Sequence, residues 1–175
     1  GLAALITVAL AVLMVYGIRL SGKKLPVLIL PLTTIGYAAP GAVLGIGILV
    51  PLAYFDNWLA DRIFDLTRYD PGLIFTGTSI AIILAYCVRF FSIAQQTVDG
   101  ALGRVSPSLS NAARSLGRNK LQVLWEIYRP LISASTATAL LLVFVDCVKE
   151  LPATMLLRPF NFETLATRVH VQASL

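Results

Sequence analysis

Few side chains in this sequence are of the types that do covalent or metal chemistry, and their spacing fits neither kind of site. Cys87 and Cys147 each lie alone in an apolar segment and are interpreted as small core residues. His170 is the only histidine, which excludes a histidine-based metal cluster within this chain. The aspartates of one polar stretch match no EF-hand spacing, so a solvated loop is expected there: Asp56, Asp61, Asp65 and Asp70. These residues and their spacing therefore predict no metal site.

The chemistry that the spacing does favour is protein docking, in the basic stretch 106–130. Ser106-Pro107 is a helix-start signal, with the serine hydroxyl as N-cap and proline at the first helical position. Gly117 can adopt a positive φ and end the helix. One small apolar face is expected from residues at i, i+3, i+4 and i+7 spacing: Leu109, Ala112, Ala113 and Leu116. The two alanines keep this face shallow, as in a helix that lies in a groove of another protein.

A second apolar pattern follows the docking helix, after a polar turn formed by Arg118, Asn119 and Lys120. The expected arrangement is a helix, a glycine hinge and a second helix, which runs parallel to the membrane before it enters the membrane. The apolar positions of this second helix are Leu121, Leu124, Ile127 and Leu131. On periodicity alone, the favoured alternative is an interfacial amphipathic helix that merely anchors the loop.

The elements that position this stretch are expected to be membrane spans, because 57% of the 175 residues are hydrophobic and only 13% are charged. A soluble domain of this length carries about 25% charged residues. The net charge of +5 lies in loops beside apolar segments, as in membrane topology, and forms no nucleic-acid-reading face. The sequence therefore predicts an all-α, polytopic transmembrane helix bundle that contacts lipid and binds no nucleic acid.

The first half of the chain is expected to hold two spans. Residues 2–20 can cross a hydrocarbon core of about 30 Å, and the basic residues at their end mark the cytoplasmic side: Arg19, Lys23 and Lys24. Proline and glycine interrupt the next apolar run, so an irregular or amphipathic lead-in over 25–39 precedes a span over 40–55. Gly41 and Gly45 form a small-xxx-small pair, for which ordinary helix packing is favoured and a broken pathway helix is the alternative.

The second half completes four spans. An outside loop with a short surface helix is expected over 54–71, and a third span over 72–91. Arg89, at the end of that span, is expected to snorkel to the cytoplasmic headgroups. A cytoplasmic loop over 92–130 leads to a fourth span over 131–147, and an amphipathic outside segment follows. Because Gly1 opens directly in an apolar run, the chain is interpreted as part of a larger membrane protein.

The spacing in the docking stretch resembles the cytoplasmic loop signature of permease subunits of binding-protein-dependent ABC importers. That signature is E-A-A, three residues, G, nine residues, I-x-L-P, and here it stands as Asn111-Ala112-Ala113, Gly117 and Ile127-Tyr128-Arg129-Pro130. Asn111 replaces the acidic residue, and Arg129 replaces the leucine before the proline. The resemblance implies a type I, methionine-importer-like fold, with 1–175 as part of a permease domain. It also implies ATPase docking through Asn111, Ala112, Ala113, Leu116, Gly117, Arg118, Ile127 and Pro130.

A second resemblance concerns the substrate. Residues 149–154 (KELPAT), 156–160 and 163–166 look like the segment after the fourth span in ferric-iron-type permeases, and 37–41 (YAAPG) is similar to an early pathway helix of that group. Importers of putrescine, thiamine, sulfate and molybdate share parts of the KELP segment. Ferric-type permeases have two fused halves, and this chain looks like most of the second half.

The resemblance implies a transport subunit of the bacterial inner membrane that catalyses no covalent reaction itself. ATP and Mg²⁺ would bind a separate cytoplasmic ATPase dimer, which fits the lack of a glycine-rich phosphate loop in this sequence. The other implied partners are a periplasmic substrate-binding protein and the other permease half. The competing classes are a fragment of a secondary transporter or channel, and a purely structural membrane subunit.

Several residues are candidates for the pathway or an outer gate. Counting from Tyr128 at 1.5 Å per residue places Asp146 about 27 Å along its helix, close to the outer boundary. Lys149 and Glu150 are interpreted first as charges that offset each other at the interface. The complete candidate set is Tyr37, Pro40, Gly41, Asp146, Lys149 and Glu150.

Overall fold

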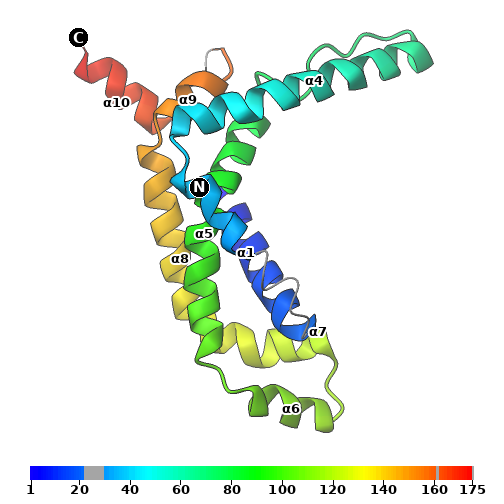
Figure 1. Ribbon diagram of the computed structural model, residues 1–175, viewed down its shortest axis with the longest axis vertical. Coiled ribbons are helices and arrows are strands. Elements are labelled where there is room, and N and C mark those ends of the chain that lie inside the picture. Colours follow the sequence, from blue (N-terminus) through cyan, green and yellow to red (C-terminus); the bar gives the residue numbers. More distant parts are fainter. Residues whose placement is uncertain (22–29, 161, 175) are drawn as a thin grey trace.

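The computed structural model describes residues 1–21, 30–160 and 162–174, and every regular element within them is a helix (Figure 1). Lys23, Lys24 and the start of the expected lead-in lie outside the described residues. In chain order the elements are α1 (Leu2–Ser21), η1 (Leu30–Thr33), α3 (Thr34–Ala38), α4 (Gly41–Thr67), α5 (Ser79–Gly103), α6 (Pro107–Ser115), α7 (Lys120–Val123), η2 (Leu124–Tyr128), α8 (Arg129–Lys149), α9 (Pro152–Leu157) and α10 (Leu165–Ala173).

Four helical stretches are long and apolar enough to cross a membrane: Leu2–Arg19, Gly41–Thr67, Ser79–Gly103 and Lys120–Lys149. The last of these combines α7, η2 and α8 into one helix of 30 residues. The predicted all-α bundle with four spans is therefore confirmed.

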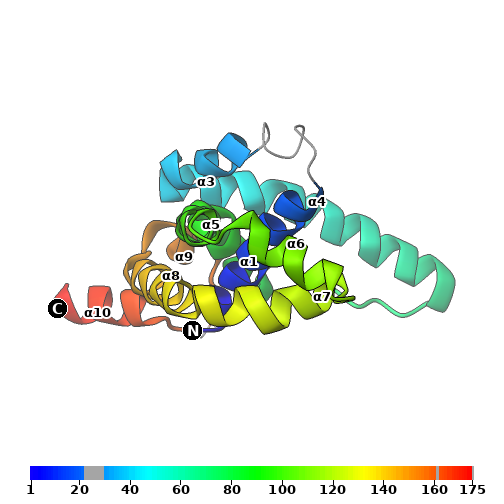
Figure 2. The same cartoon turned by 90° about the horizontal axis from the view of Figure 1, so that it is seen from below.

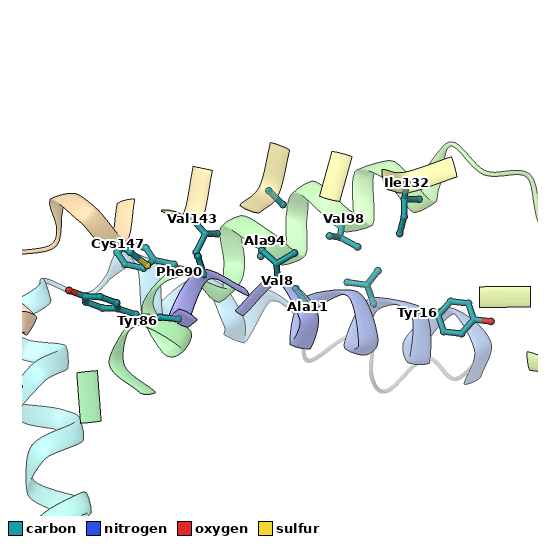
Figure 3. Packing of buried hydrophobic residues seen from close by; sticks show 14 of the residues in the cluster. Val8, Ala11, Tyr16, Tyr86, Phe90, Ala94, Val98, Ile132, Val143 and Cys147 are labelled. Carbon is teal, nitrogen blue, oxygen red and sulfur yellow. The ribbon is translucent and has the colours of Figure 1, made fainter. Parts of the chain in front are cut away.

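The core lies where α1, α5 and α8 pack side by side (Figure 3). Val8, Val98 and Val143 point into it from the three helices. Alanines without exposed surface occupy many of the contact points: Ala4, Ala11, Ala85, Ala94 and Ala139. Small residues let helix backbones approach closely in a membrane, where close packing must replace the water-driven force between helices.

Polar contacts join α1, α5 and α7 at one end of the bundle. Arg19 Nη2 lies 2.8 Å from Asp99 Oδ1 and donates to the Asp99 carbonyl at 3.0 Å. The Tyr16 hydroxyl donates to the Lys120 carbonyl. The two segments that precede the basic loops thus end together, as expected if both loops lie on the cytoplasmic side.

Helix α4 is longer than the sequence suggested. It continues through Pro51 to Thr67 and projects beyond the rest of the bundle (Figure 1, Figure 2). The expected end of the span near Phe55 is therefore wrong, because most of the expected outside loop is helical. The polar side chains there do not end the helix. It ends where Arg68 adopts the left-handed conformation (φ 58°) and donates its N–H to the Phe64 carbonyl at 2.8 Å.

Asp56 is fully buried, contrary to the expected solvated loop. Its carboxylate accepts the backbone N–H groups of Ile74, Phe75 and Thr76 at 2.6 to 3.1 Å. Hydrogen bonds from backbone N–H groups to an ionised acceptor are stronger than neutral ones. Asp56 therefore holds the connection between α4 and α5 against α4.

Replacing Asp56 with asparagine is expected to lower the free energy of unfolding by about 2 kcal/mol. An amide presents one acceptor oxygen where the carboxylate presents two, so charge-assisted hydrogen bonds worth about 1.5 to 3 kcal/mol are lost. Thermal unfolding of the detergent-solubilised protein measures the change. Asp61→Asn is the matched control, because Asp61 is exposed on the same helix. Equal destabilisation by both variants would contradict this role of Asp56.

Helix α5 begins and ends later than the expected third span over 72–91. Thr78 caps its first turn by accepting the Ile80 N–H at 3.3 Å, and the helix continues to Gly103. Arg89 is therefore ten residues from Ser79 and ten from Asp99, in the middle of the helix and not at its cytoplasmic end.

After α8 the chain turns at Glu150 and Leu151, and α9 packs against α4 and α5. Thr154 of α9 is buried and its hydroxyl hydrogen-bonds with the Tyr86 hydroxyl of α5. Helix α10 then leads away from this contact, with only Thr167 buried among its residues (Figure 1). The segment expected to be amphipathic thus begins inside the bundle and ends on its exposed side.

Candidate functional site

Helix α6 lies at one end of the molecule, beneath α7 (Figure 1). The Ser106 hydroxyl accepts the Ser108 N–H at 3.3 Å, so the predicted N-cap is confirmed. The opposite end closes as a Schellman turn: the Gly117 N–H donates to the Arg114 carbonyl (3.0 Å) and the Arg118 N–H to the Ala113 carbonyl (3.1 Å). Gly117 has a φ of 83°, so the predicted glycine stop is also confirmed.

Most of the expected apolar face of α6 points away from the rest of the protein. Ala113 alone is buried, with 8% of its surface exposed, and it anchors the helix to the bundle. Leu116 is 84% exposed, and Asn111 and Ala112 are exposed as well. The structure therefore presents a short helix with fixed ends whose outer surface is available to a partner.

The second helix of the docking stretch is capped by Asn119 and Gln122, which accept each other's backbone N–H groups at 2.8 and 2.9 Å. It then contains a π-turn, η2, just before Pro130. Proline cannot donate to the carbonyl four residues earlier, and a π-turn absorbs such a lost hydrogen bond. Helix α7 thereby continues into α8 without a break.

The predicted apolar face of this second helix is partly wrong. Leu121 and Leu131 are more than half exposed, and Ile127 is half-buried. The buried positions are Val123, Leu124, Tyr128 and Ile132. A π-turn holds more residues per turn than an α-helix, so a face counted at 3.6 residues per turn loses its register there.

An ion pair joins the glycine turn to the second helix. Arg118 Nε lies 3.1 Å from Glu126 Oε2, and both side chains are about half exposed. Arg118 was expected to contact the ATPase. In the structure it links the turn after α6 to η2, and the expected ATPase contact stays a prediction.

Replacing Gly117 with alanine is expected to raise the hydrogen–deuterium exchange rate of the α6 amides about fivefold or more. A β-carbon at φ 83° costs about 1 to 2 kcal/mol, and local opening of a short exposed helix reports that cost directly. Gly100→Ala is the control, because Gly100 lies inside α5 with open space around it. Unchanged exchange in Gly117→Ala would contradict the Schellman turn.

A second polar centre lies inside the bundle, between Arg89 of α5 and Glu150 at the end of α8. Arg89 Nε and Glu150 Oε2 are 2.8 Å apart, and the side chains are 17% and 7% exposed. Arg89 Nη1 donates to the Ala39 carbonyl at 2.6 Å, and the Ala153 N–H donates to Glu150 Oε1 at 3.2 Å. Arg89 therefore does not snorkel to the headgroups as expected, because a buried carboxylate neutralises it within the bundle.

Two interruptions of helical structure meet at this ion pair. Helical structure is interrupted at Ala39 and Pro40, between α3 and α4, and again at Glu150 and Leu151, between α8 and α9. A side chain on Gly41 would collide with Glu150 Oε1, so the glycine allows this close approach. The pairing shows that Glu150 is not offset by its neighbour Lys149, which is exposed.

The depth of this centre follows from α5. Arg89 is ten residues, or about 15 Å, from both Ser79 and Asp99. A hydrocarbon core is about 30 Å thick, so the ion pair would lie near its middle if Ser79 and Asp99 mark the two boundaries. Ionisable side chains at that depth are rare and mark functional positions.

Asp146 lies on α8, eleven residues, or about 16 Å of helix, beyond Ser135. Ser135 Oγ accepts a hydrogen bond from Arg104 Nη2 at 3.2 Å. The expected position of Asp146 near the outer boundary stays a prediction.

The structure brings together only part of the candidate pathway set. Pro40, Gly41 and Glu150 meet at the ion pair. Tyr37 is 50% exposed, and within the described part of the chain neither it nor Asp146 nor Lys149 forms an ion pair or side-chain hydrogen bond. The described residues also hold no group of three or more His, Cys, Asp or Glu side chains that could bind a metal ion.

Sequence reasoning missed two functional or structural residues, Arg89 and Asp56. A signal was present for Arg89, since an arginine between long apolar segments is a functional candidate by default. Because the predicted third span ended at residue 91, Arg89 was placed at the membrane surface and this signal was overlooked. No local pattern marks Asp56, because its three partners are about twenty residues away.

The fold and these sites define a polytopic membrane protein with an exposed, capped helix at one end of its bundle. Within that class, the chain belongs to the family described as binding-protein-dependent transport system inner membrane component, whose pattern matches residues 4–159. The resemblance to importer permeases is thereby confirmed, as is location in the bacterial inner membrane.

Curated relatives share about a third of their matched residues with this chain. It is 30% identical over 169 residues to the Fe(3+)-transport system permease protein FbpB 2 of Haemophilus influenzae, covering 97% of this chain and 30% of that protein. It is 30% identical over 145 residues to the ferric transport system permease protein FbpB of Actinobacillus pleuropneumoniae, covering 81% of this chain and 20% of that protein. The chain thus spans less than a third of the length of the curated relatives it matches.

Proposed function

We propose that this chain is a segment of the permease of an ATP-driven importer and that α6 docks in a cleft of a cytoplasmic ABC ATPase. The observation that carries this proposal is the exposure of α6: among the α6 side chains whose burial is described, only Ala113 is buried, although both helix ends are fixed. A merely anchoring interfacial helix would bury an apolar face in the bilayer, and here the apolar surface is small. The same positions carry the importer loop signature.

In this proposal, movement of the ATPase reaches the membrane bundle through the continuous chain from α6 to α8. ATPase closure would displace α6, and the glycine turn and the Arg118–Glu126 ion pair would pass that displacement to α7. Because α7, η2 and α8 form one helix, movement at Lys120 reaches the end of α8 at Lys149, next to the buried Glu150. The permease halves would then rock between inward and outward states. ATP and Mg²⁺ bind the ATPase dimer in this proposal, and this chain supplies no catalytic residue or cofactor site.

The proposed cargo is ferric iron, received from a periplasmic binding protein. Two relatives named for ferric or Fe(3+) transport support this choice, as does the KELP segment at residues 149–152. Glu150, within that segment, forms the buried pair with Arg89 where two helix breaks meet. Broken helices at mid-membrane are where transporters place their pathways, so this centre is the proposed pathway gate. Tyr37, Asp146 and Lys149 remain peripheral candidates.

The function is tested with the full-length permease and its ATPase in proteoliposomes. Ferric-loaded binding protein is expected to stimulate ATP hydrolysis and iron uptake together. Binding proteins loaded with polyamine, thiamine, sulfate or molybdate are expected to have no effect. Stimulation by one of those instead would overturn the iron assignment, and uptake driven by an ion gradient without ATP would support a secondary transporter.

A further inference from the structure

An apolar groove lies between α1 and the α7–α8 helix. It has a volume of about 500 Å³. Leu5, Val8 and Val12 line one wall, and Ile132 and Leu140 line the other. Leu5 is 55% exposed, so the groove is open on its outer side.

The hydroxyl groups in the groove are already satisfied by their own helix. Ser133 Oγ donates to the Pro130 carbonyl and Thr136 Oγ1 to the Ile132 carbonyl, both at 2.9 Å. Such bonds to the preceding turn leave no unpaired donor to attract water. The walls of the groove therefore act as hydrocarbon surface along α8.

One end of the groove carries a positive charge. Arg129 lines that end, with its guanidinium 5.0 Å from the centre of the Trp125 ring. Arg129 is exposed, and among the described residues no carboxylate lies within ion-pair distance of it. This is also the position at which the sequence departs from the importer loop signature, where arginine replaces leucine. A cation held beside an exposed tryptophan is typical of the headgroup level of a membrane.

The position of Arg129 along the membrane agrees with that interpretation. The Tyr128 ring contacts the Tyr16 ring at 5.4 Å, one turn from the Arg19–Asp99 ion pair at the cytoplasmic end. From Arg129 to Leu140 the groove follows eleven residues of helix, or about 16 Å. Half of a hydrocarbon core of about 30 Å is about 15 Å, so the groove has the length of one leaflet.

We propose that this groove binds an anionic phospholipid of the cytoplasmic leaflet, with Arg129 on its phosphate and one acyl chain between α1 and α8. Basic pockets between membrane helices on the cytoplasmic side suit such headgroups. The positive charge of Arg129 favours an anionic lipid over a neutral one. The groove is as long as one leaflet, so an acyl chain can lie along it. Because α7 and α8 also form the proposed coupling path, the lipid would lie against the moving helix. The binding site itself depends on neither the ATPase nor the cargo.

The test uses the full-length permease in nanodiscs with a trace of phosphatidylglycerol that carries a photoreactive group in mid-chain. After irradiation, mass spectrometry is expected to locate cross-links on residues 5–13 and 132–140, and unlabelled phosphatidylglycerol should compete better than phosphatidylcholine. Arg129→Gln should lower groove labelling about fivefold, the factor for one cation at the membrane surface. Ala137→Trp, which fills the groove, should lower labelling by both lipids. Arg114→Gln, on α6 outside the groove, should change nothing.

Two results would overturn the proposal. Equal competition by the two lipids, with no effect of Arg129→Gln, would show that the groove does not select an anionic headgroup. Labelling of other lipid-facing surfaces without labelling of the groove would show that another part of the permease covers it. Neither result bears on ATPase docking by α6, which is measured separately.

Discussion

Replacing Leu116 with glutamate is expected to weaken association of the ATPase with the permease at least tenfold, without unfolding the membrane bundle. Leu116 is 84% exposed at the end of α6, so the substitution leaves the fold intact. In the proposed complex the leucine is buried in the ATPase cleft, where loss of a central apolar anchor costs about 2 kcal/mol or more, or roughly 30-fold in Kd. Copurification and titration of the ATPase against permease in nanodiscs measure the effect.

The matched control is Leu66→Glu. Leu66 is 85% exposed and lies near the far end of α4, away from α6 (Figure 1). The two substitutions have the same chemistry and exposure, so they differ only in location. Equal ATPase affinity in the two variants would contradict docking through α6. Ala113→Glu is a poorer test, because Ala113 is buried and a charge there would also disrupt packing.

Breaking the Arg89–Glu150 pair is expected to produce the largest loss of stability. Arg89→Met leaves Glu150 as an uncompensated buried charge, and Glu150→Gln does the same to Arg89. Each single change is expected to cost about 3 to 5 kcal/mol, whereas the double variant should cost much less than the sum. The measurement is thermal unfolding, in detergent, of the unmodified protein, the two single variants and the double variant, which together form a double-mutant cycle.

The structure offers a control with the same chemistry at the surface. The Arg118–Glu126 pair joins the same two atom types, Nε and Oε2, but both side chains are about half exposed. Exposed pairs contribute about 0 to 1 kcal/mol, so Arg118→Met should barely change the unfolding temperature. Additive effects of Arg89→Met and Glu150→Gln would mean that the two charges do not compensate each other.

The parts that the sequence predicted well are those that local chemistry determines. Ser106-Pro107 and Gly117 mark the two ends of α6, because an N-cap hydroxyl and a residue with positive φ are needed at those positions whatever the rest of the chain does. The four spans were also found, because twenty apolar residues have few other stable locations.

The errors fall where distant residues decide the structure. Polar residues after Phe55 suggested a loop, but burial of Asp56 against the segment around Phe75 lets α4 continue. The Arg89 side chain was predicted to reach the lipid headgroups. Its partner, Glu150, is 61 positions away in the sequence, so no local pattern indicated the ion pair. Hydropathy cannot distinguish an arginine that snorkels from one that a buried carboxylate neutralises.

The predicted apolar face of the second docking helix was partly wrong for a different reason. Helical periodicity was counted through residues 124–128, where the π-turn before Pro130 shifts the register. Proline was visible in the sequence, but the way in which the helix absorbs it was not. Leu131 consequently faces outward, while Tyr128 and Ile132 face the core.

The most direct test of the central claim is photo-cross-linking from α6. A photoreactive amino acid at position 112, which is exposed, is introduced into the full-length permease assembled with its ATPase. Docking predicts one dominant cross-link to the ATPase subunit, with a yield that changes when ATP binds. Cross-links to lipid or to other permease segments, with none to the ATPase, would contradict the account.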